Sequence, residues 1–189
     1  MSWTLFELST LDGPFRRDGA ASRARIMLKE GVSTDAIEDL IAQLAATTEQ
    51  MAALLGSVDD QDWTPTDSRW SFRYVAAHME ACQTECVLVR VRQMAFGAKP
   101  RFEFYDNEGW DFSDRDLAES VRLWRESRAR VFAFIRSLSV ERLSRTGSHQ
   151  TFGEITPFDY LKIDLDHDRE HIKSVERMLA ERGSRPGQA

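Results

Sequence analysis

The sequence predicts an all-α fold: a four-helix bundle with a long crossover between its second and third helices. Four long segments repeat apolar residues at intervals of three and four, which is the helical period. No segment of comparable length shows the alternation of a strand. The stretch between the second and third segments, about residues 98–112, is long for a simple hairpin between bundle helices. The length of 189 residues fits one domain.

The first two helices are bounded by ordinary start and stop signals. We expect the first to begin with Thr34 as its N-cap and to end at Gly56. The second is predicted from about Ser71 to Phe96, because Gly97 interrupts the pattern there. Both segments carry enough apolar side chains on one side to pack against neighbouring helices.

The last two helices follow the same logic. Ser113 is the expected N-cap of the third helix, whose apolar pattern continues to about Leu138. The fourth is predicted to begin at Thr156 and Pro157, because proline is favoured at the first helical position, and to end at Gly183. The crossover is rich in aromatic and acidic residues. We expect its aromatic side chains to line a pocket at the bundle, namely Phe102, Phe104, Tyr105 and Trp110.

Three regions are expected along the chain: an N-terminal extension packed on the bundle (1–33), the bundle (34–182) and a disordered tail (183–189). The formal charge of −6 argues against nucleic acid as a partner, and no apolar run is long enough to cross a membrane. The N-terminal segment does not resemble a signal peptide. Cys82 and Cys86 lie four apart in a helix, a spacing that suits a disulfide poorly. We therefore expect reduced thiols and a cytoplasmic protein.

Three histidines are predicted to face the bundle core. On a helical wheel, His167 and His171 lie about 40° apart on the apolar face of the fourth helix. His78 lies on the inward arc of the second helix, an arc that also includes Cys82, Glu85 and Val89. A single inward histidine is commonly a satisfied core residue, but three inward rings each need partners for two nitrogens. A divalent ion held by His78, His167 and His171 would meet that need.

Other metal chemistries fit the pattern less well. A ferritin-like di-metal site needs glutamates and Glu-x-x-His pairs from several helices, whereas Asp164-x-x-His167 and Asp168-x-x-His171 share one helix. The stretch His167 to His171 also matches the inverted zincin pattern H-x-x-E-H, in which Glu170 is the general base. The third ligand of that family lies far downstream, so we keep only Glu170 as a candidate base.

Further polar residues surround the predicted site. Asp164 and Asp168 each precede a histidine by three residues, and either could accept a ring N–H and fix the tautomer. Cys82 lies one turn after His78 and is either a fourth ligand or a small core residue. His149 lies in a predicted loop, where we expect a surface side chain. Glu85 is expected to form an ion pair with a core-facing arginine such as Arg128.

Two stretches of sequence resemble the DinB/YfiT-like superfamily. The segment from Trp70 to His78 is similar to the start of its second helix, where Trp-Ser precedes a metal-binding histidine. The segment from Phe152 to His171 is similar to its fourth helix with paired histidines. The resemblance covers about residues 35–180. It implies a four-helix bundle with an unusual crossover and one divalent metal ion, zinc or nickel, held by three histidines. It also implies that homodimers are common.

The resemblance implies two kinds of activity, hydrolysis and S-transfer. Members of this superfamily include thiol S-transferases that use bacillithiol, a mycothiol-dependent maleylpyruvate isomerase and metal-dependent hydrolases. We therefore expect a metalloenzyme in which a three-histidine site activates water or a low-molecular-weight thiol to attack a small electrophilic substrate. The alternative is a non-catalytic, stress-related or interaction protein whose metal is structural. A closed fourth coordination position would favour that alternative, and an open one would favour catalysis.

Overall fold

The computed structural model describes residues 32–184 and forms a four-helix bundle. The first long helix is α2 (Thr34–Gly56), and the third and fourth are α5 (Leu117–Arg136) and α7 (Pro157–Ser184). The second comprises three consecutive helical segments, α3 (Phe72–Ala81), η2 (Cys82–Val87) and α4 (Leu88–Phe96). The predicted fold class is thus confirmed. The predicted N-terminal extension and tail lie almost wholly outside the described residues.

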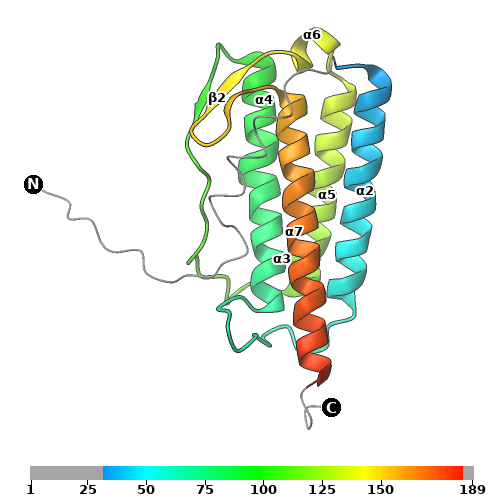
Figure 1. Ribbon diagram of the computed structural model, residues 1–189, viewed down its shortest axis with the longest axis vertical. Coiled ribbons are helices and arrows are strands. Elements are labelled where there is room, and N and C mark those ends of the chain that lie inside the picture. The colour runs from blue at the N-terminus through cyan, green and yellow to red at the C-terminus, as the bar shows by residue number, and fades with distance from the viewer. Residues whose placement is uncertain (1–31, 185–189) are drawn as a thin grey trace, which may run out of the picture.

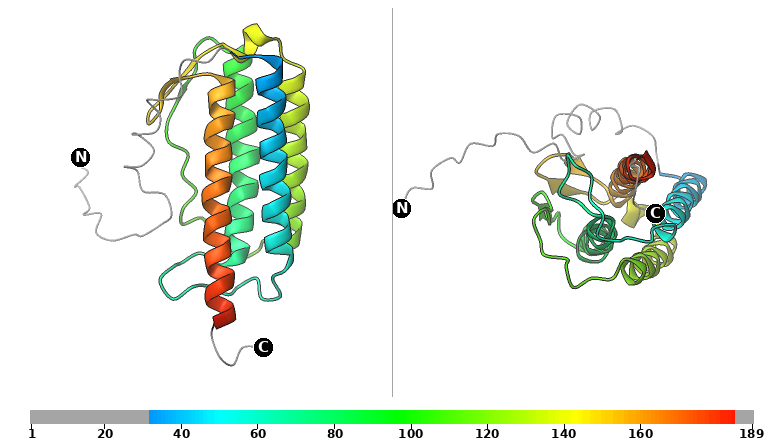
Figure 2. Two further views of the ribbon diagram at one scale, coloured as in Figure 1. Left: turned by 45° about the vertical axis from the view of Figure 1, so that its right-hand side comes forward. Right: turned by 90° about the horizontal axis from the view of Figure 1, so that it is seen from below.

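The connection between the second and third helices is a crossover. In Figure 1, α2 and α7 run in one direction, whereas α3–α4 and α5 both run in the other. The linker 97–116 must therefore return along the length of the bundle before α5 begins, and it does so on the outside of α3 and α4 (Figures 1 and 2). α7 packs against α2 on one side and α4 on the other. The linker is thus placed beside the groove between α4 and α7.

Helix boundaries follow capping chemistry. Ser33, rather than the predicted Thr34, caps α2, since its hydroxyl accepts a hydrogen bond from the Ala36 N–H at 3.1 Å. α5 begins later than predicted: Asp116 rather than Ser113 is the cap, and its carboxylate accepts from the Glu119 N–H. Ser113 instead belongs to a preceding turn, in which its N–H donates to Asp111. Each shift replaces the predicted cap with a residue whose oxygen reaches a free helix N–H.

A small three-stranded sheet, which the sequence pattern does not predict, ties the linker to the loop before α7. β1 (Arg101–Phe102) pairs parallel with β2 (Gly147–His149), and β2 pairs antiparallel with β3 (Gly153–Ile155). These strands have two or three residues each, too few for an alternating pattern to be detected. The sheet orders the turn 149–152 beside α4 and α7.

Two apolar clusters fill the bundle, one in each half. The half nearer β2 is built around Leu44, Val131 and Leu161, and receives Leu143 from the short helix α6 (Val140–Leu143). The other half is built around aromatic and aliphatic residues from all four helices, including Met51, Phe72, Trp124 and Val175. These side chains are almost fully buried. The bundle is therefore a continuous core, and polar groups inside it need specific partners.

The π-helical segment η2 corrects the predicted inward face of the second helix. A π-turn adds one residue to the helical repeat, so that every later position moves by about 100°. Glu85 is exposed and Val89 is 41% exposed, whereas Cys86 is only 5% exposed. The residues that face inward after Cys82 are therefore Cys86 and Arg90, each one position later than a regular helix would place them.

Two further expectations concern the described part of the chain. Cys82 and Cys86 are both free thiols, as expected from their spacing. Among the helices within residues 32–184, none combines the length and hydropathy needed to span a bilayer.

Candidate metal centre

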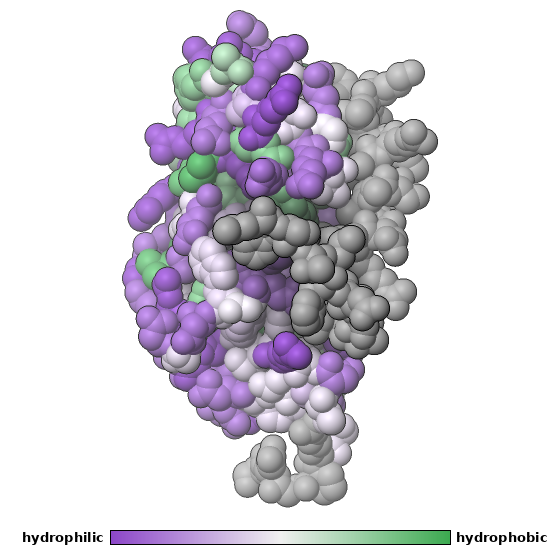
Figure 3. Space-filling model, turned by 90° about the vertical axis from the view of Figure 1, so that its left-hand side faces the viewer, coloured by the Kyte–Doolittle hydropathy of each residue, from purple (hydrophilic) through white to green (hydrophobic). Residues whose placement is uncertain are grey.

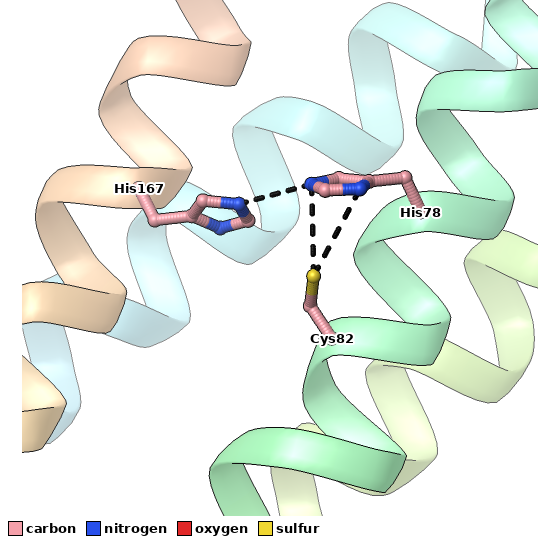
Figure 4. A group of neighbouring side chains, drawn as sticks. All are labelled: His78, Cys82 and His167. Atoms are coloured by element: carbon pink, nitrogen blue, oxygen red, sulfur yellow. Dashed lines mark hydrogen bonds between the residues drawn. The ribbon is translucent and has the colours of Figure 1, made fainter. Parts of the chain in front are cut away.

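The structure brings the three predicted histidines together. His78 extends from α3, and His167 and His171 extend from α7 toward it. The Nε2 atom of His167 lies 3.1 Å from Nε2 of His78 and 3.1 Å from Nε2 of His171. Figure 4 shows His78 and His167 facing each other across the space between the two helices. Helices far apart in sequence thus bring the three rings into one cluster, with His167 Nε2 close to both of the others.

The spacing of these nitrogens fits a divalent ion. Two nitrogen ligands at about 2.0–2.1 Å from one ion and about 90–110° apart are separated by about 2.9–3.4 Å. The two separations measured from His167 Nε2, 3.1 Å to His78 and 3.1 Å to His171, fall in this range, whereas the donor atoms that all lie within 4.8 Å of one another are those of His78, His167 and Cys82. Hydrogen bonding alone explains the cluster poorly, because one proton on His167 Nε2 satisfies only one of its two neighbours. His171 Nδ1 is buried, and no group within residues 32–184 hydrogen-bonds to it.

Asn107, which the sequence analysis missed, fixes the orientation of His78. Its Oδ1 lies 2.6 Å from His78 Nδ1, so Nδ1 carries the proton and donates it, and the lone pair of Nε2 points at the cluster. The linker that carries Asn107 is held by Tyr74: the Tyr74 hydroxyl donates to the Asn107 carbonyl at 3.0 Å and accepts from the Gly109 N–H at 2.8 Å. The crossover therefore supplies a hydrogen-bond partner for the His78 ring.

Burial keeps all three rings neutral. It lowers the pKa of His78 to about 4, with the Asn107 contact acting in the opposite direction. Burial also lowers the pKa values of His167 and His171 well below the ordinary value, with further lowering from the neighbouring imidazoles. Trp70 contributes to this environment, since its ring stacks on His171 with centroids 5.6 Å apart and packs on His78 at 4.8 Å. Neutral imidazoles are the form that binds a metal.

Cys82 is close to the cluster, but its sulfur lies beside the face of the His78 ring. Its Sγ is 3.6 Å from His78 Nε2 and 3.9 Å from Nδ1, so it is almost equally far from both nitrogens. A sulfur in front of the Nε2 lone pair would be much farther from Nδ1 than from Nε2. Figure 4 shows the sulfur to one side of the ring. Although Cys82, His78 and His167 offer donor atoms within 4.8 Å of one another, we conclude that Cys82 is not in a ligand position.

The predicted role of Asp164 and Asp168 is corrected by Arg128. Both carboxylates bind its guanidinium: Asp164 accepts from Nη1, and Asp168 accepts from Nη2 at 2.7 Å. Asp168 also accepts a hydrogen bond from Thr47 Oγ1 at 2.7 Å. Within residues 32–184, neither aspartate hydrogen-bonds directly to a histidine ring. The physical reason is that Arg128 is only 1% exposed and needs buried counter-charges, so the predicted ion pair with exposed Glu85 does not form.

A cavity of about 490 Å³ opens beside the histidines. Its walls come from α3, η2 and α4 on one side, α7 on the other, and the linker and the turn 149–152 outside. Phe104 and Tyr105 line it as predicted, whereas Phe102 packs in the core and Trp110 is 43% exposed. Glu170, the candidate base, is not among its lining residues.

The far end of the cavity contains His149, which the sequence analysis placed on the surface. The β2–β3 pairing folds it inward, and it is only 3% exposed. Its Nε2 lies 3.1 Å from Nη1 of Arg90, and the same Nη1 donates to Tyr160 Oη at 3.2 Å. The cavity therefore has two polar ends, the histidine cluster and the contacts around Arg90.

The DinB superfamily model matches residues 43–175. The chain belongs to the DinB superfamily. Among solved structures, this DinB-superfamily protein is similar to YfiT from Bacillus subtilis, described as a probable metal-dependent hydrolase with an unusual four-helix bundle topology. The two share 23% sequence identity with a TM-score of 0.71, over 82% of this chain and 92% of YfiT. This likeness shows a common fold. No curated protein sequence matches the chain significantly.

Proposed function

We propose that this protein is a metal-dependent enzyme in which His78, His167 and His171 hold one divalent ion, zinc or nickel. The observation that carries the proposal is the clustering of three neutral imidazoles, in which His167 Nε2 lies 3.1 Å from Nε2 of both His78 and His171, in the wall of a cavity large enough for a small molecule. An ion held there would lower the pKa of a coordinated water or thiol, so that a nucleophile is available near neutral pH.

The residues of the chain prepare the site for such chemistry. Asn107 holds the His78 ring in the tautomer that offers its Nε2 lone pair. Trp70 packs over His78 and His171 and limits their access to water. The aromatic side chains of the linker give the cavity an apolar wall that suits a small electrophilic substrate. The reaction we propose is therefore hydrolysis by water or S-transfer from a low-molecular-weight thiol.

The alternative is a structural ion that only ties α3 to α7. Cys82 as a fourth ligand would close the coordination sphere and favour this alternative. The position of its sulfur beside the His78 ring face supports an open site instead. The cavity next to the histidines gives a substrate access to that open position.

Metal analysis of protein purified without an affinity tag tests the site. We expect about one equivalent of zinc or nickel in the wild type and a large loss in His167→Ala. The matched control is His149→Ala, which removes a buried histidine outside the cluster and should keep the metal. Equal metal contents in the wild type and His167→Ala would refute the assignment.

Activity is tested with the metal-loaded protein and a panel of small electrophiles, with and without added thiols. Loss of thiol faster than in buffer indicates S-transfer, and acid release without thiol indicates hydrolysis. Either activity should disappear in His167→Ala. A metal-loaded protein with neither activity, whose stability falls on chelation, would support the structural alternative.

A further inference from the structure

The end of the cavity opposite the histidines contains a cation, Arg90, that has no carboxylate partner among residues 32–184. Within the described chain, the Arg90 guanidinium contacts only neutral groups: the His149 ring, the Tyr160 hydroxyl and the Glu103 backbone carbonyl, which accepts from Nη2 at 2.7 Å. The guanidinium also lies over the Phe102 ring, 5.2 Å from its centroid. A half-buried guanidinium that lines a cavity, with no counter-ion from the described residues, is suited to receive an anion.

The contacts of His149 point to the same conclusion. The N–H groups of Thr151 and Phe152 both point at its Nδ1, at 3.1 and 3.4 Å. Burial and the charge of Arg90 lower the pKa of His149 to about 4, so the ring is neutral. A neutral imidazole has one proton, and acceptance at Nδ1 places it on Nε2. Nε2–H then faces an Arg90 N–H at 3.1 Å, and these two donors lack an acceptor between them.

The charged side chains along the cavity favour an anion at the Arg90 end. Asp106 and Glu108 line the cavity near the histidine cluster, where Asp106 acts electrostatically on His78 and both act on Tyr74. Asp164, the remaining carboxyl in the wall, is bound to Arg128. Among the side chains of the wall, the carboxylates near the histidine end therefore disfavour an anion there, whereas the Arg90 guanidinium attracts one.

The middle of the cavity is apolar. Val87 and Ile163 line it, and each lies on its helix between residues of the two polar ends, whereas the Phe152 ring packs on His149 with centroids 4.7 Å apart. Tyr160 and His167 are seven residues apart on α7, which corresponds to about 10 Å along the helix. Figure 3 views the molecule from the side of the linker and β2: hydrophilic residues cover most of this face, and hydrophobic ones gather mainly in its upper half.

We propose that Arg90 and His149 form an anion-binding subsite that takes the carboxylate or phosphate group of a small, otherwise apolar molecule. The subsite rests on the contacts of these two residues. We also infer that the opposite end of this ligand reaches the histidines, about 10 Å away, and this second inference rests on the proposed function. The substrate class is then an elongated electrophile or thiol with an anionic group at the end remote from the reacting atom.

Calorimetric titration of the full-length protein with hexanoate and hexylphosphonate tests the subsite, with hexan-1-ol as the neutral probe. We expect either anion to bind at least tenfold more tightly than the alcohol, and the tighter of the two identifies the preferred group. Arg90→Gln should lose about tenfold or more in affinity for the anion, because it removes a charged double donor. Arg92→Gln is the matched control: Arg92 lies on the same helix, over the Phe134 ring and outside the cavity.

The titrations are repeated on metal-loaded and chelator-treated protein, so that binding to an ion is separated from binding to Arg90. Loss in Arg90→Gln under both conditions supports the subsite even where metal analysis refutes the proposed function. A folded Arg90→Gln that keeps wild-type affinity, or an alcohol that binds as tightly as the anions, overturns the proposal. If Arg90→Gln does not fold, the side-chain nitrogen resonances of His149 in the wild type decide: they should shift when hexylphosphonate binds, and unchanged resonances contradict the subsite.

Discussion

Replacing Arg128 by methionine should strongly destabilise the bundle. The side chain of Arg128 is 1% exposed, and those of its partners Asp164 and Asp168 are 4% and 0% exposed. Methionine has a similar unbranched shape, so the substitution mainly removes charge and donors. It leaves two carboxyl groups inside the bundle without their cation. Removing one member of a buried ion pair typically costs about 3–5 kcal/mol, and we expect a loss of that size in the free energy of unfolding at pH 7.5.

The loss should grow as the pH rises. Burial raises the pKa of Asp164 to about 7 even with Arg128 present, and it also raises the pKa of Asp168. Without the guanidinium, which opposes both shifts, both carboxyl groups stay protonated in the folded state to higher pH. The unfolded chain releases these protons near pH 4, so the folded variant binds more protons than the unfolded one. Its stability therefore falls with rising pH, by up to about 1.4 kcal/mol per pH unit for each proton.

Urea unfolding between pH 6 and pH 8, followed by far-ultraviolet circular dichroism, measures this effect. Arg130→Met is the matched control, because Arg130 lies on the same helix with its side chain 69% exposed and should change stability by less than about 0.5 kcal/mol. The triple variant that adds Asp164→Asn and Asp168→Asn should recover much of the loss, since it removes the two buried carboxyl groups that have lost their cation. A loss for Arg128→Met below about 1 kcal/mol, or one that does not increase from pH 6 to pH 8, would refute the reasoning.

Three further outcomes are expected. Asn107→Ala should lower metal affinity about 10- to 100-fold in a competition with a chromophoric chelator, because His78 loses the acceptor that fixes its tautomer; unchanged affinity would contradict this role. Cys82→Ser should keep wild-type metal affinity, and the Co²⁺-loaded wild type should lack a thiolate charge-transfer band in the near ultraviolet; such a band, lost in Cys82→Ser, would make Cys82 a ligand. His149→Gln should flatten the pH dependence of stability. The pKa of His149 is about 4 in the folded wild type and about 6.5 in the unfolded chain, so wild-type stability falls by up to about 3 kcal/mol as the pH drops from 6.5 to 4. Equal pH slopes of the wild type and the variant in urea unfolding would argue against a neutral, buried ring.

Local patterns in the sequence are enough to predict the helices and the inward direction of the three histidines. α7 is an unbroken helix from Pro157 to Ser184, so a wheel of constant angle places His167 and His171 correctly on its inner face. His78 lies in α3, before the π-turn, and its position is equally predictable. The spacing of apolar residues predicts a regular helix well because the helical period alone fixes which positions share a face.

Contacts between distant segments account for what the sequence did not reveal. Asn107 meets His78 only because the crossover returns along the bundle, and no local pattern specifies the height at which the linker passes. Arg128 pairs with two aspartates of α7, a choice that depends on how α5 and α7 align. His149 turns inward because a sheet of very short strands forms, and such strands carry no periodic signal.

The π-turn links the two ends of the cavity. In a regular helix, residues spaced by four drift around the axis by about 40° at each step, so a line from His78 to Arg90 would wind about 120° away from α7. The extra residue in η2 takes back about 100° of this drift. His78, Cys82, Cys86 and Arg90 consequently all line one cavity, although the first and last are twelve residues apart. The irregular segment thus places the His78 ring and the Arg90 guanidinium, the two groups to which we assign metal and anion binding, along one cavity facing α7, an arrangement that a straight α-helix of the same sequence would not give.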